Sequence, residues 1–370
     1  MSRPVRVLAL APYPARAPST RFRLVQYGEA LADLGVDLHV HTFVTADVYQ
    51  TSPGWKRGLG GAKVVARGLR DLRAALGQIR AYDVVIVQRG IAPFVDGWVV
   101  RALKKAGVPL VYDFDDAVYL PQQGGGGWVE RLRAPQRATA SFCRAAAHVL
   151  AGNAHLADFA RNALGPGSHP RVSILPSVVD TDRFAPRPRT SDGPPVLGWV
   201  GSDSTIPYLE TLAPALAELC RLTRCRVTVV AGRRRPLLPG VAFDFVPWSA
   251  DAEVALIRGL DVGLYPLEDS PWARGKCGFK ALQYLACGVP CVASPVGVLM
   301  DIVLPGETGY LADTPEAWIQ ACARLVGDAG ARLRLGEAGR RLVEERYSLE
   351  IHAPVLAGVL REAAALRGDA

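Results

Sequence analysis

Three basic residues in the second half of the chain have the spacing of an anion-binding loop. Arg274, Lys276 and Lys280 lie within seven residues, in a loop that leads into a helix expected to begin near Gly278. Side-chain cations beside the positive end of a helix dipole favour a bound anion such as a diphosphate. A solvated basic loop is the alternative interpretation, but the nearby glycines, Trp272 and the apolar helix favour phosphate contact.

A second candidate anion site follows an apolar run that ends at Gly201. The sequence there reads Gly-Ser-Asp-Ser-Thr-Ile-Pro, in which Gly201, Ser202 and Thr205 offer backbone amides and hydroxyls. The alternative is a helix N-cap at Ser204 or Thr205, with Pro207 in the first turn. The two interpretations are compatible, because a capped helix start is itself an anion site.

Three carboxylates close an apolar run in the first half of the chain. Asp113, Asp115 and Asp116 occur in the segment VYDFDDAVY. Like charges this close repel each other unless they are bonded to donors, so we expect a role in the functional site. Capping of a loop by the aspartates is the alternative.

Elements that position these residues follow from the alternation of apolar runs and helical patterns. In the first half, strand–helix–strand alternation predicts a parallel sheet with right-handed crossovers. The expected strands are Val5–Ala9, Asp37–Phe43, Val84–Gln88, Pro109–Phe114, His148–Ala151 and Val172–Leu175, and the expected helices include Arg23–Leu34 and Val99–Ala106.

The same α/β pattern restarts after a segment rich in proline and polar residues. We therefore expect a first domain over 1–184, a linker over 185–195 and a second domain over 196–370, whose last helix can pack back on the first domain. The second domain is expected to contain strands at 196–201, 226–231, 241–246, 261–265 and 290–293, with helices at 208–223, 252–259 and 279–287 and a helical tail. Ligands of doubly wound sheets bind beyond the carboxyl ends of the strands.

Composition sets outer limits on what the chain can be. Its 370 residues suggest two domains, and 49% hydrophobic with 21% charged residues excludes disorder as the dominant state. The net charge of +8 favours anionic partners. Seven scattered cysteines without a zinc-like cluster indicate reduced thiols, and the first apolar stretch is interpreted as a buried strand rather than a signal peptide, so a cytoplasmic protein is expected.

A family resemblance rests on five segments that occur in family order. The segment WARGKCGFKALQYLACGVPCVASPVG (272–297) resembles the donor-site signature of retaining GT-B glycosyltransferases of the large family-four group, the glycosyl transferases group 1. The other segments are ILPSVVDTDRFAP (174–186), VLGWVG (196–201), DVGLYPLED (261–269) and GYLADTPEAWIQACARLVGD (309–328). The resemblance is dense in the second half of the chain and loose in the first.

The resemblance implies a fold and an activity. The fold is α/β, with two Rossmann-like doubly wound parallel-sheet domains facing a central cleft. The implied activity is transfer of a sugar, with retention of configuration, from a nucleotide-sugar donor held mainly by the second domain. A glycan, a lipid-linked molecule or a small molecule held by the first domain is the acceptor. No metal and no cofactor are expected.

The resemblance also assigns roles to single residues of the second half. Lys276 and Lys280, with Arg274, neutralise the departing nucleotide diphosphate, and Trp248 stands where the family packs the nucleobase. Many members carry two glutamates where this chain has Gly275 and Gln283. The amide of Gln283 can hydrogen-bond a ribose hydroxyl, whereas Gly275 supplies no side chain.

In the first half, Asp115 aligns approximately with a family histidine near the reacting carbon. Asp115 or Asp116 is therefore expected to contact the donor sugar or to orient the acceptor hydroxyl, with action as a base among the options. Arg21 and Arg23 follow a proline-rich loop after the first strand, and either reach a phosphate of donor or acceptor or decorate a helix start. An Asp-x-Asp after an apolar strand also marks metal-dependent GT-A transferases, but the second α/β half argues against that fold.

Two further surface features bear on partners. Residues 61–80 predict an amphipathic helix whose basic face, with Lys63, Arg67 and Arg70, suits peripheral contact with an anionic membrane and hence a lipid-linked acceptor; core contact with a solvated outer face is the alternative. Gly124–Gly127 followed by Trp128 predicts a mobile loop. Nucleic acid is not expected as a partner, because the basic residues lack interleaved aromatic residues.

Two competing functions remain open from the sequence. The missing glutamate pair motivates a catalytically decayed nucleotide-sugar-binding protein. A sugar-nucleotide epimerase of similar architecture would change the donor or release diphosphate without an acceptor.

Overall fold

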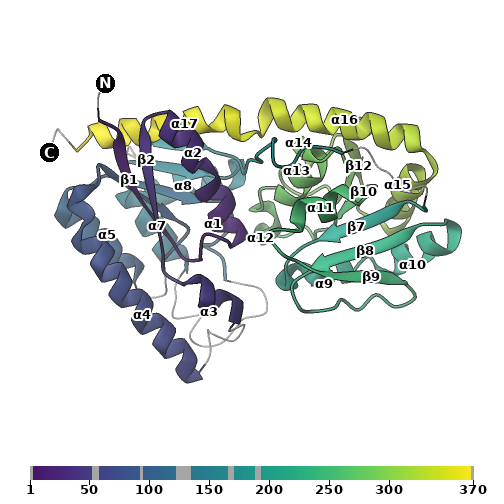
Figure 1. Ribbon diagram of the computed structural model, residues 1–370, viewed down its shortest axis with the longest axis horizontal. Helices are drawn as coiled ribbons and strands as arrows, with labels where there is room; N and C mark the ends of the chain where they lie inside the picture. Colours follow the sequence, from purple (N-terminus) through teal and green to yellow (C-terminus); the bar gives the residue numbers. More distant parts are fainter. Residues whose placement is uncertain are drawn as a thin grey trace. The chain divides into compact units, whose positions relative to one another are not determined.

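The chain folds into two compact α/β units. The computed structural model describes residues 3–51, 58–91, 95–121, 135–165, 171–187 and 193–367, so the predicted Gly124–Trp128 loop lies outside the described residues. Unit 1 comprises Met1–Ser177 together with Leu349–Ala370, and unit 2 comprises Val178–Ser348 (Figure 1). The chain thus leaves unit 1 after Ser177, before the predicted end of the first domain at 184, and returns to it for its last helix.

Unit 1 is built on a six-stranded parallel sheet in the order β2-β1-β3-β4-β5-β6. Its central strands are short runs of β-branched and aromatic residues buried on both faces, as expected of a parallel sheet covered by helices. The pairing places Gln88, the last residue of β3, opposite Asp113 of β4. The strands are β1 Val5–Ala11, β2 Val36–Thr42, β3 Val84–Gln88, β4 Leu110–Phe114, β5 His148–Ala151 and β6 Arg171–Ile174.

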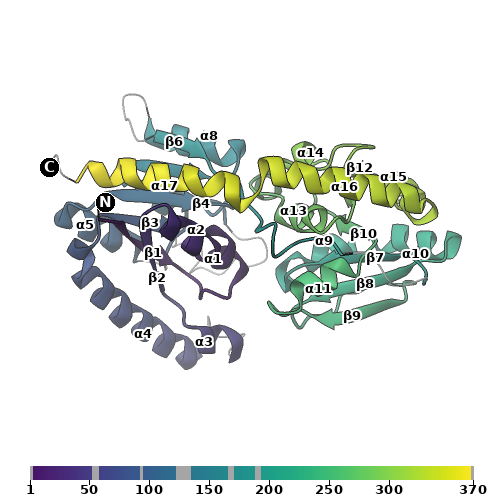
Figure 2. The same cartoon turned by 45° about the horizontal axis from the view of Figure 1, so that its top comes forward.

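Helices cover both faces of this sheet. The last helix of the chain, α17 (Leu349–Ala365), packs against α2 and against β1, β3 and β4 (Figure 2). The crossover helices α5 and α7 pack side by side, and α7 also packs against α8 and β4. The remaining helices of the unit are α1 Pro18–Arg23, α2 Gly28–Asp33, α3 Ala46–Thr51, α4 Gly58–Gly77, α5 Asp96–Ala106, α7 Pro135–Ala145 and α8 Ala154–Leu164, with 3-10 turns at Val25–Tyr27 and Ile79–Ala81.

The predicted helix over Arg23–Leu34 is wrong in its continuity. The chain forms α1, then a 3-10 turn, then α2, because the backbone of Leu24 leaves the helical region at φ −129° and ψ −60°. Thr20 of α1 donates a hydrogen bond to the carbonyl oxygen of Tyr13 at 3.0 Å, which ties α1 to the loop after β1.

Unit 2 repeats the architecture with strand order β12-β11-β10-β7-β8-β9, all parallel. Glycines in its central strands make room for large side chains. A Cβ on Gly263 would lie 2.3 Å from the ring of Tyr284, whose hydroxyl accepts a hydrogen bond from the backbone of Val200. The strands are β7 Val196–Val200, β8 Arg226–Ala231, β9 Phe243–Pro247, β10 Val262–Tyr265, β11 Cys291–Ala293 and β12 Gly309–Leu311.

Helices α10 and α15 pack together and bury the main apolar cluster of unit 2, while α13 packs against α11, α14 and α16. The predicted helix over Tyr208–Thr223 is divided into α9 and α10. Pro214 occupies the first turn of α10, where its missing N–H costs nothing, whereas inside a continuous helix it would remove a hydrogen bond and clash with the preceding turn. The helices are α9 Ile206–Glu210, α10 Ala213–Leu222, α11 Glu253–Arg258, α12 Pro271–Arg274, α13 Phe279–Ala286, α14 Leu299–Ile302, α15 Pro315–Gly327 and α16 Ala329–Arg346.

The strand orders locate one switch point in each sheet, where chain direction across the sheet reverses. In unit 1 it lies between β1 and β3, and in unit 2 between β7 and β10. Open α/β sheets bind ligands beyond the carboxyl ends of the strands at such points. The residues that follow β7 and β10, and those that follow β1, β3 and β4, are therefore the ones to examine.

Candidate functional site

Lys280 lies at the switch point of unit 2. It belongs to the first turn of α13, and its ammonium lies 4.5 Å from the ring centroid of Trp199 on β7 and 5.2 Å from that of Tyr265 on β10. Its Nζ also donates a hydrogen bond to Oγ1 of Thr205 at 3.2 Å. Among the described residues, no carboxylate pairs with this ammonium. The cation is thus held by aromatic faces and a hydroxyl, which leaves it able to attract an anion.

The pKa of Lys280 is lowered to about 7, because burial disfavours the ammonium and the charge of Lys276 repels it. A lysine in this state is roughly half protonated at neutral pH, and an anion beside it would favour the charged form. Such a shift, combined with a position at the switch point, is typical of functional rather than structural lysines.

The residues after β7 form a rigid turn beside Lys280. Ser202 and Thr205 form a capping box, in which the Ser202 amide donates to Thr205 Oγ1 at 3.2 Å and the Thr205 hydroxyl donates to the carbonyl oxygen of Ser202 at 2.9 Å. Gly201 must be a glycine, since a Cβ there would lie 2.2 Å from Trp199 and 2.9 Å from Lys280 Nζ. The structure therefore brings together Gly201, Ser202, Thr205 and Lys280, which come from two separate candidate segments of the sequence.

The two other predicted cations lie on the segment that precedes α13. The ammonium of Lys276 lies 6.0 Å from the ring centroid of Trp272 and is close enough to Lys280 to shift its pKa. Arg274 ends α12 and forms a two-armed ion pair with Asp269, with both N–O distances at 2.7 Å. Because that carboxylate neutralises Arg274, its charge contributes less to an anion site than the charges of the two lysines.

Gln283 and Trp248 occupy different environments. Gln283 is 3% exposed, and its Nε2 has no hydrogen-bond partner among the described residues. Leaving a buried amide donor unpaired is costly, so this position is a candidate for a ligand contact. Trp248 follows β9 and donates from its indole nitrogen to the buried carboxyl of Glu253 at 3.2 Å, which fixes the ring orientation.

A further cation was not identified from the sequence. Arg233 follows β8 at the same carboxyl edge of the sheet and is exposed. Its backbone amide donates to the Asp203 carboxylate at 3.1 Å, which ties the loop after β8 to the turn that contains Thr205. The neighbouring Arg234 is instead paired with Glu210. The run of three arginines directly after a strand was the available signal.

At the carboxyl edge of unit 1, the predicted residue Arg23 is a buried structural group. Its side chain is 1% exposed and forms a two-armed ion pair with Asp113, with the Nε–Oδ2 distance at 3.1 Å. Its Nη1 donates to the carbonyl oxygens of Leu175 and Pro176 at 2.8 Å each. Contact with a phosphate would break these bonds, so Arg23 is not carried into the functional proposal. Arg21 is also buried, with its guanidinium 4.2 Å from the ring centroid of Phe22.

Asp115 and Asp116 are held by an arginine that the sequence analysis missed. Arg89 Nε donates to Asp115 Oδ1 at 2.7 Å, and Arg89 Nη2 donates to Asp116 Oδ2 at 3.3 Å. Burial raises the pKa of Asp115, but the guanidinium of Arg89, aided by Arg23, outweighs this and holds the pKa below its ordinary value. Asp115 is therefore ionised at neutral pH, and because its lowered pKa makes it a weak base, the role of a hydrogen-bond acceptor suits it better than that of a general base.

The backbone of Arg89 is unusual. Its φ is +61°, and within the described ranges it is the one non-glycine residue with positive φ. Its amide donates to the carbonyl oxygen of Asp113 at 2.7 Å. A side chain in this conformation costs about 1 kcal/mol or more, so strong local interactions must hold it. Such outliers occur preferentially at functional sites, which makes Arg89 part of the candidate site.

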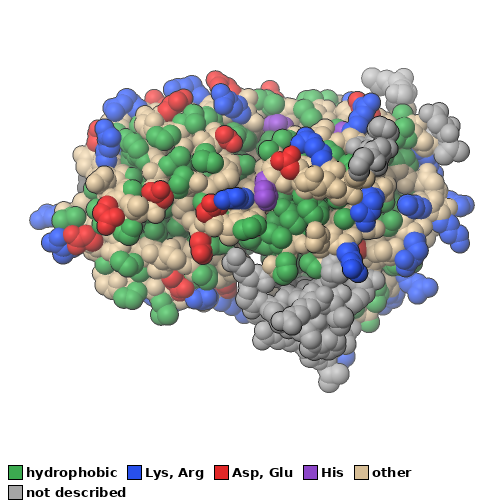
Figure 3. All heavy atoms as spheres, turned by 180° about the vertical axis from the view of Figure 1, so that it is seen from behind, with side chains coloured by type: hydrophobic (Ala, Val, Ile, Leu, Met, Phe, Trp, Pro, Cys, Tyr) green, Lys and Arg blue, Asp and Glu red, His purple; other side chains and the backbone are tan. Residues whose placement is uncertain are grey.

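The described residues contain neither a cluster of metal ligands nor a membrane-spanning helix. No group of three or more His, Cys, Asp or Glu side chains there is arranged to hold a metal ion, and no described helix is long and apolar enough to cross a membrane. Part of the basic face of α4 is neutralised, because Arg67 lies near Asp47 and Asp71 and Arg70 pairs with Asp71. Figure 3 shows Lys and Arg side chains spread over one face, several of them beside Asp or Glu. Peripheral membrane contact stays a prediction.

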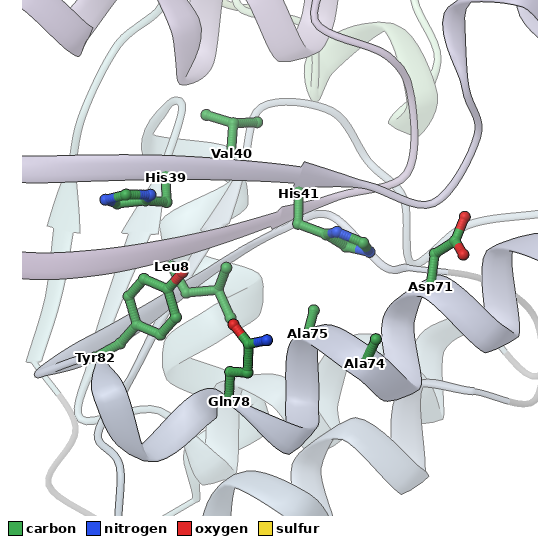
Figure 4. Close-up of a pocket in the computed structure, with 9 residues that line it drawn as sticks. All are labelled: Leu8, His39, Val40, His41, Asp71, Ala74, Ala75, Gln78 and Tyr82. Atoms are coloured by element: carbon green, nitrogen blue, oxygen red, sulfur yellow. The ribbon is translucent and has the colours of Figure 1, made fainter.

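A pocket of about 370 Å³ lies away from these edges, between β2 and α4 of unit 1. Figure 4 shows His41 of β2 pointing toward Asp71 of α4, with Gln78, the residue after α4, also lining the pocket. His41 Nε2 is buried and has no hydrogen-bond partner among the described residues. Burial lowers the pKa of His41, and Asp71 only partly offsets this. None of the predicted site residues lines this pocket.

Comparison with known proteins finds a family match within unit 2. Residues 194–328 match the family model described as Glycosyl transferases group 1. A segment of 141 residues, 35% of this chain, is 31% identical to D-inositol 3-phosphate glycosyltransferase of Salinispora arenicola and covers 30% of that protein. In this relative and in two further D-inositol 3-phosphate glycosyltransferases, the matched segment spans less than half the length of the relative.

Solved structures match nearly the whole chain. Sucrose-phosphate synthase from Thermosynechococcus elongatus aligns with a TM-score of 0.74 and 18% identity, over 97% of this chain and 99% of that chain. HepE of Anabaena, solved in complex with UDP-glucose, aligns with a TM-score of 0.64 and 16% identity, over 96% and 99% of the two chains. At such identities the likeness concerns the fold. Residues 194–328 are thus similar to the glycosyl transferases group 1, and the chain has the α/β architecture of the GT-B fold.

Proposed function

We propose that this protein is a glycosyltransferase that binds a nucleoside-diphosphate sugar at the carboxyl edge of unit 2 and transfers the sugar to a hydroxyl acceptor with retention of configuration. The observation that carries the proposal is the ammonium of Lys280, held between two aromatic rings at the switch point without a carboxylate partner among the described residues. The match to a glycosyltransferase family over the same residues supports it.

The chemical need in such a transfer is to stabilise the leaving diphosphate. As the glycosidic bond to phosphate lengthens, negative charge grows on the bridging oxygen, and fixed cations lower the barrier. In the proposal, Lys280 and Lys276 supply this charge, and Arg233 binds the diphosphate from the loop after β8. The amides and hydroxyls of Gly201, Ser202 and Thr205 line the same edge. Because a bound diphosphate favours the ammonium form, Lys280 is charged most fully when the donor is in place and negative charge grows on the bridging oxygen.

The remaining parts of the donor would be bound by neighbouring groups. The unpaired amide of Gln283 is offered to a ribose hydroxyl, and the indole of Trp248, oriented by Glu253, packs on the nucleobase. HepE is solved with UDP-glucose, so UDP-glucose is the first donor to test. Gly275 stands where many family members carry a glutamate, and it provides no carboxylate. In the proposal a backbone amide takes over part of the contact with the donor sugar.

Unit 1 contributes the acceptor side in this proposal. Asp115 and Asp116, held in place by Arg89, accept hydrogen bonds from the acceptor hydroxyl or from the donor sugar and orient the reacting groups. Because Asp115 is ionised and paired, its proposed role is orientation, and proton transfer to the leaving phosphate oxygen is the route left for the acceptor proton. The class of acceptor, whether glycan, lipid-linked or small molecule, is open to test.

The experiment is a donor screen with a charge-deleted variant. A panel of nucleotide sugars is tested by calorimetry and by release of nucleoside diphosphate, with native protein and with Lys280→Met and Lys276→Met. We expect one donor to bind the native protein, Lys280→Met to reduce turnover by about 10²–10³-fold, and the exposed-lysine control Lys105→Met to behave as native. Because Lys280 is partly buried, its replacement should leave the melting temperature unchanged or higher.

The competing functions give distinct results in the same assay. A decayed binder would bind a donor but release no nucleoside diphosphate, with or without acceptors. An epimerase would convert or cleave the donor without any acceptor. If a nucleotide sugar bound native protein and both lysine variants with equal affinity, the assignment of Lys276 and Lys280 to the donor site would be wrong.

A further inference from the structure

Two of the seven cysteines differ from the others in their position. Cys220 lies in the last turn of α10 and Cys225 directly precedes β8, and both are partly exposed. Their Sγ atoms are 3.9 Å apart. The other five, Cys143, Cys277, Cys287, Cys291 and Cys322, are buried. All seven are free thiols in the structure.

The turn between α10 and β8 holds the two thiols at this distance. Both the amide and the hydroxyl of Thr223 donate to the carbonyl oxygen of Leu219 at 2.9 Å, which ends the helix. The amide of Arg226 then donates to the carbonyl oxygen of Pro195 and starts the strand. A disulfide requires the Sγ atoms to approach by roughly 2 Å, to a bond length of about 2.05 Å. Rotation of the two side chains inside a fixed turn can supply that movement.

The chemical environment favours reaction at one of the two sulfurs. A hydrogen bond from the Cys220 thiol lowers the pKa of Cys225, although burial opposes this, and the same bond raises the pKa of Cys220. The thiolate is the nucleophile in disulfide exchange. Cys225 is therefore the attacking residue and Cys220 the resolving one. Cys322 is close to Cys225, but it is 1% exposed and burial raises its pKa, which disfavours it as the partner.

We propose that Cys220 and Cys225 form an oxidisable dithiol, closed to an intramolecular disulfide by exchange with a low-molecular-weight disulfide. The Cys225 thiolate attacks one sulfur of the oxidant and releases one thiolate of the small molecule. Cys220 then loses its proton and attacks Cys225 Sγ in the mixed disulfide, which releases the second thiolate. The two protein thiols are oxidised by two electrons, and the small disulfide is reduced to two thiols.

The position of the dithiol separates it from the proposed donor site. It lies at the amino end of β8, whereas Gly201, Arg233 and Lys280 lie at the carboxyl ends of the parallel strands or follow them. The proposal does not rest on the glycosyltransferase assignment. Oxidation should therefore change the affinity of any donor by less than about twofold.

The test equilibrates the reduced full-length protein with mixtures of oxidised and reduced glutathione, blocks the remaining thiols and maps peptides by mass spectrometry. We expect two of the seven thiols to disappear together and a cross-linked pair of peptides to carry Cys220 and Cys225. The five buried cysteines serve as internal controls, and alkylation should reach them only after unfolding.

Single variants separate the two roles. In Cys220→Ala, Cys225 should accumulate as a mixed disulfide with one glutathione, and its alkylation midpoint should move to higher pH because the hydrogen bond that lowers its pKa is removed. In Cys225→Ser, Cys220 should react much more slowly. Absence of the cross-linked peptide at every glutathione ratio in folded protein, or a disulfide between Cys225 and Cys322, would overturn the assignment.

Discussion

The carboxyl edges of the two sheets carry charge in opposite ways. In unit 1 each of these charged groups has a partner of opposite sign: Arg23 pairs with Asp113, and Arg89 pairs with Asp115 and Asp116. In unit 2 the central cation, Lys280, is surrounded by two aromatic rings and a hydroxyl. Similar folds therefore present one edge whose cations are paired with carboxylates and one edge whose central cation has no carboxylate partner among the described residues.

This difference indicates which edge has a cation that an anionic ligand can pair with. The edge of unit 1 has little to gain from an added anion, because its two guanidinium groups are already paired with three carboxylates. An ammonium with a lowered pKa gains from an anion, because the anion restores the charge that burial disfavours. We therefore assign anion binding to unit 2, and orientation of neutral hydroxyl groups to the ordered carboxylates of unit 1.

The largest expected effect tests whether the edge of unit 1 is a structural array. Replacing Arg23 with Met leaves Asp113 buried without its cation, which should lower the free energy of unfolding by about 3–5 kcal/mol. Chemical denaturation measures the loss. The double variant Arg23→Met with Asp113→Leu should recover most of it, because an apolar pair needs no charge balance. If the single variant were as stable as native protein, unit 1 would not have the paired edge on which the comparison rests.

The next effect separates the ion pairs of Arg89 from its backbone. Arg89→Gly suits a φ of +61° but removes the guanidinium, whereas Arg89→Ala removes the guanidinium and keeps the strain. We expect Arg89→Gly to be more stable than Arg89→Ala by about 1 kcal/mol, measured by thermal unfolding.

Both variants should slow transfer to an acceptor, by roughly tenfold or more, because a charge-assisted hydrogen bond contributes about 1.5–3 kcal/mol. Donor affinity, measured by calorimetry, should stay as in native protein. A fall in donor affinity in both variants would contradict the division of roles.

A smaller effect concerns the protonation of Lys280. Its pKa is about 7 in the free protein. A diphosphate binds the ammonium form, so at pH 7 and above its binding is coupled to uptake of a proton by Lys280. Affinity for a nucleotide sugar should be full below pH 7 and decrease by about tenfold between pH 6 and pH 8. Calorimetry in buffers of different ionisation enthalpy detects the proton uptake. In Lys280→Arg the cation stays charged throughout, so the pH dependence should disappear.

The smallest expected effect is the pH dependence of stability that comes from His41, which lies away from the carboxyl edges of both sheets. Measuring it separates this pH dependence from that of Lys280. Burial lowers the pKa of His41 in the folded protein below its ordinary value of 6.5. The unfolded chain therefore binds the proton more readily, and stability present above pH 6.5 is lost as the pH falls through the folded pKa. His41→Gln should be less sensitive to acid in thermal unfolding between pH 7 and pH 5. An identical slope in the variant would show that other groups dominate.

Local patterns in the sequence located the strands of both sheets except β12 (Gly309–Leu311), which was not predicted, and they singled out Lys280 as a candidate. Buried runs such as Val84–Gln88 and Arg226–Ala231 predict their strands at the observed bounds, since β-branched runs between turns have few other stable arrangements. Lys280 could be found because its loop and helix are contiguous in sequence.

Arg89, Arg233 and the burial of Arg23 depend on partners far along the chain. Arg23 and Asp113 are 90 positions apart, and no local pattern says that β3 lies beside β4 or that the loop after β8 is tied to Asp203. The charge pairing of an aspartate cluster is a property of the folded sheet edge. Sequence analysis could identify the carboxylates, but not the arginine that holds them.

The return of the chain to unit 1 through α17 has a consequence for synthesis in the cell. The face of the first sheet that α17 covers is completed by Leu356, Ala357 and Leu360, which emerge from the ribosome after all of unit 2. Throughout that interval, apolar surface on β1, β3 and β4 has no cover from its own helix. The nascent chain is thus most exposed to aggregation before its last few turns are made, and a premature stop near residue 348 would preserve unit 2 while leaving unit 1 unfinished.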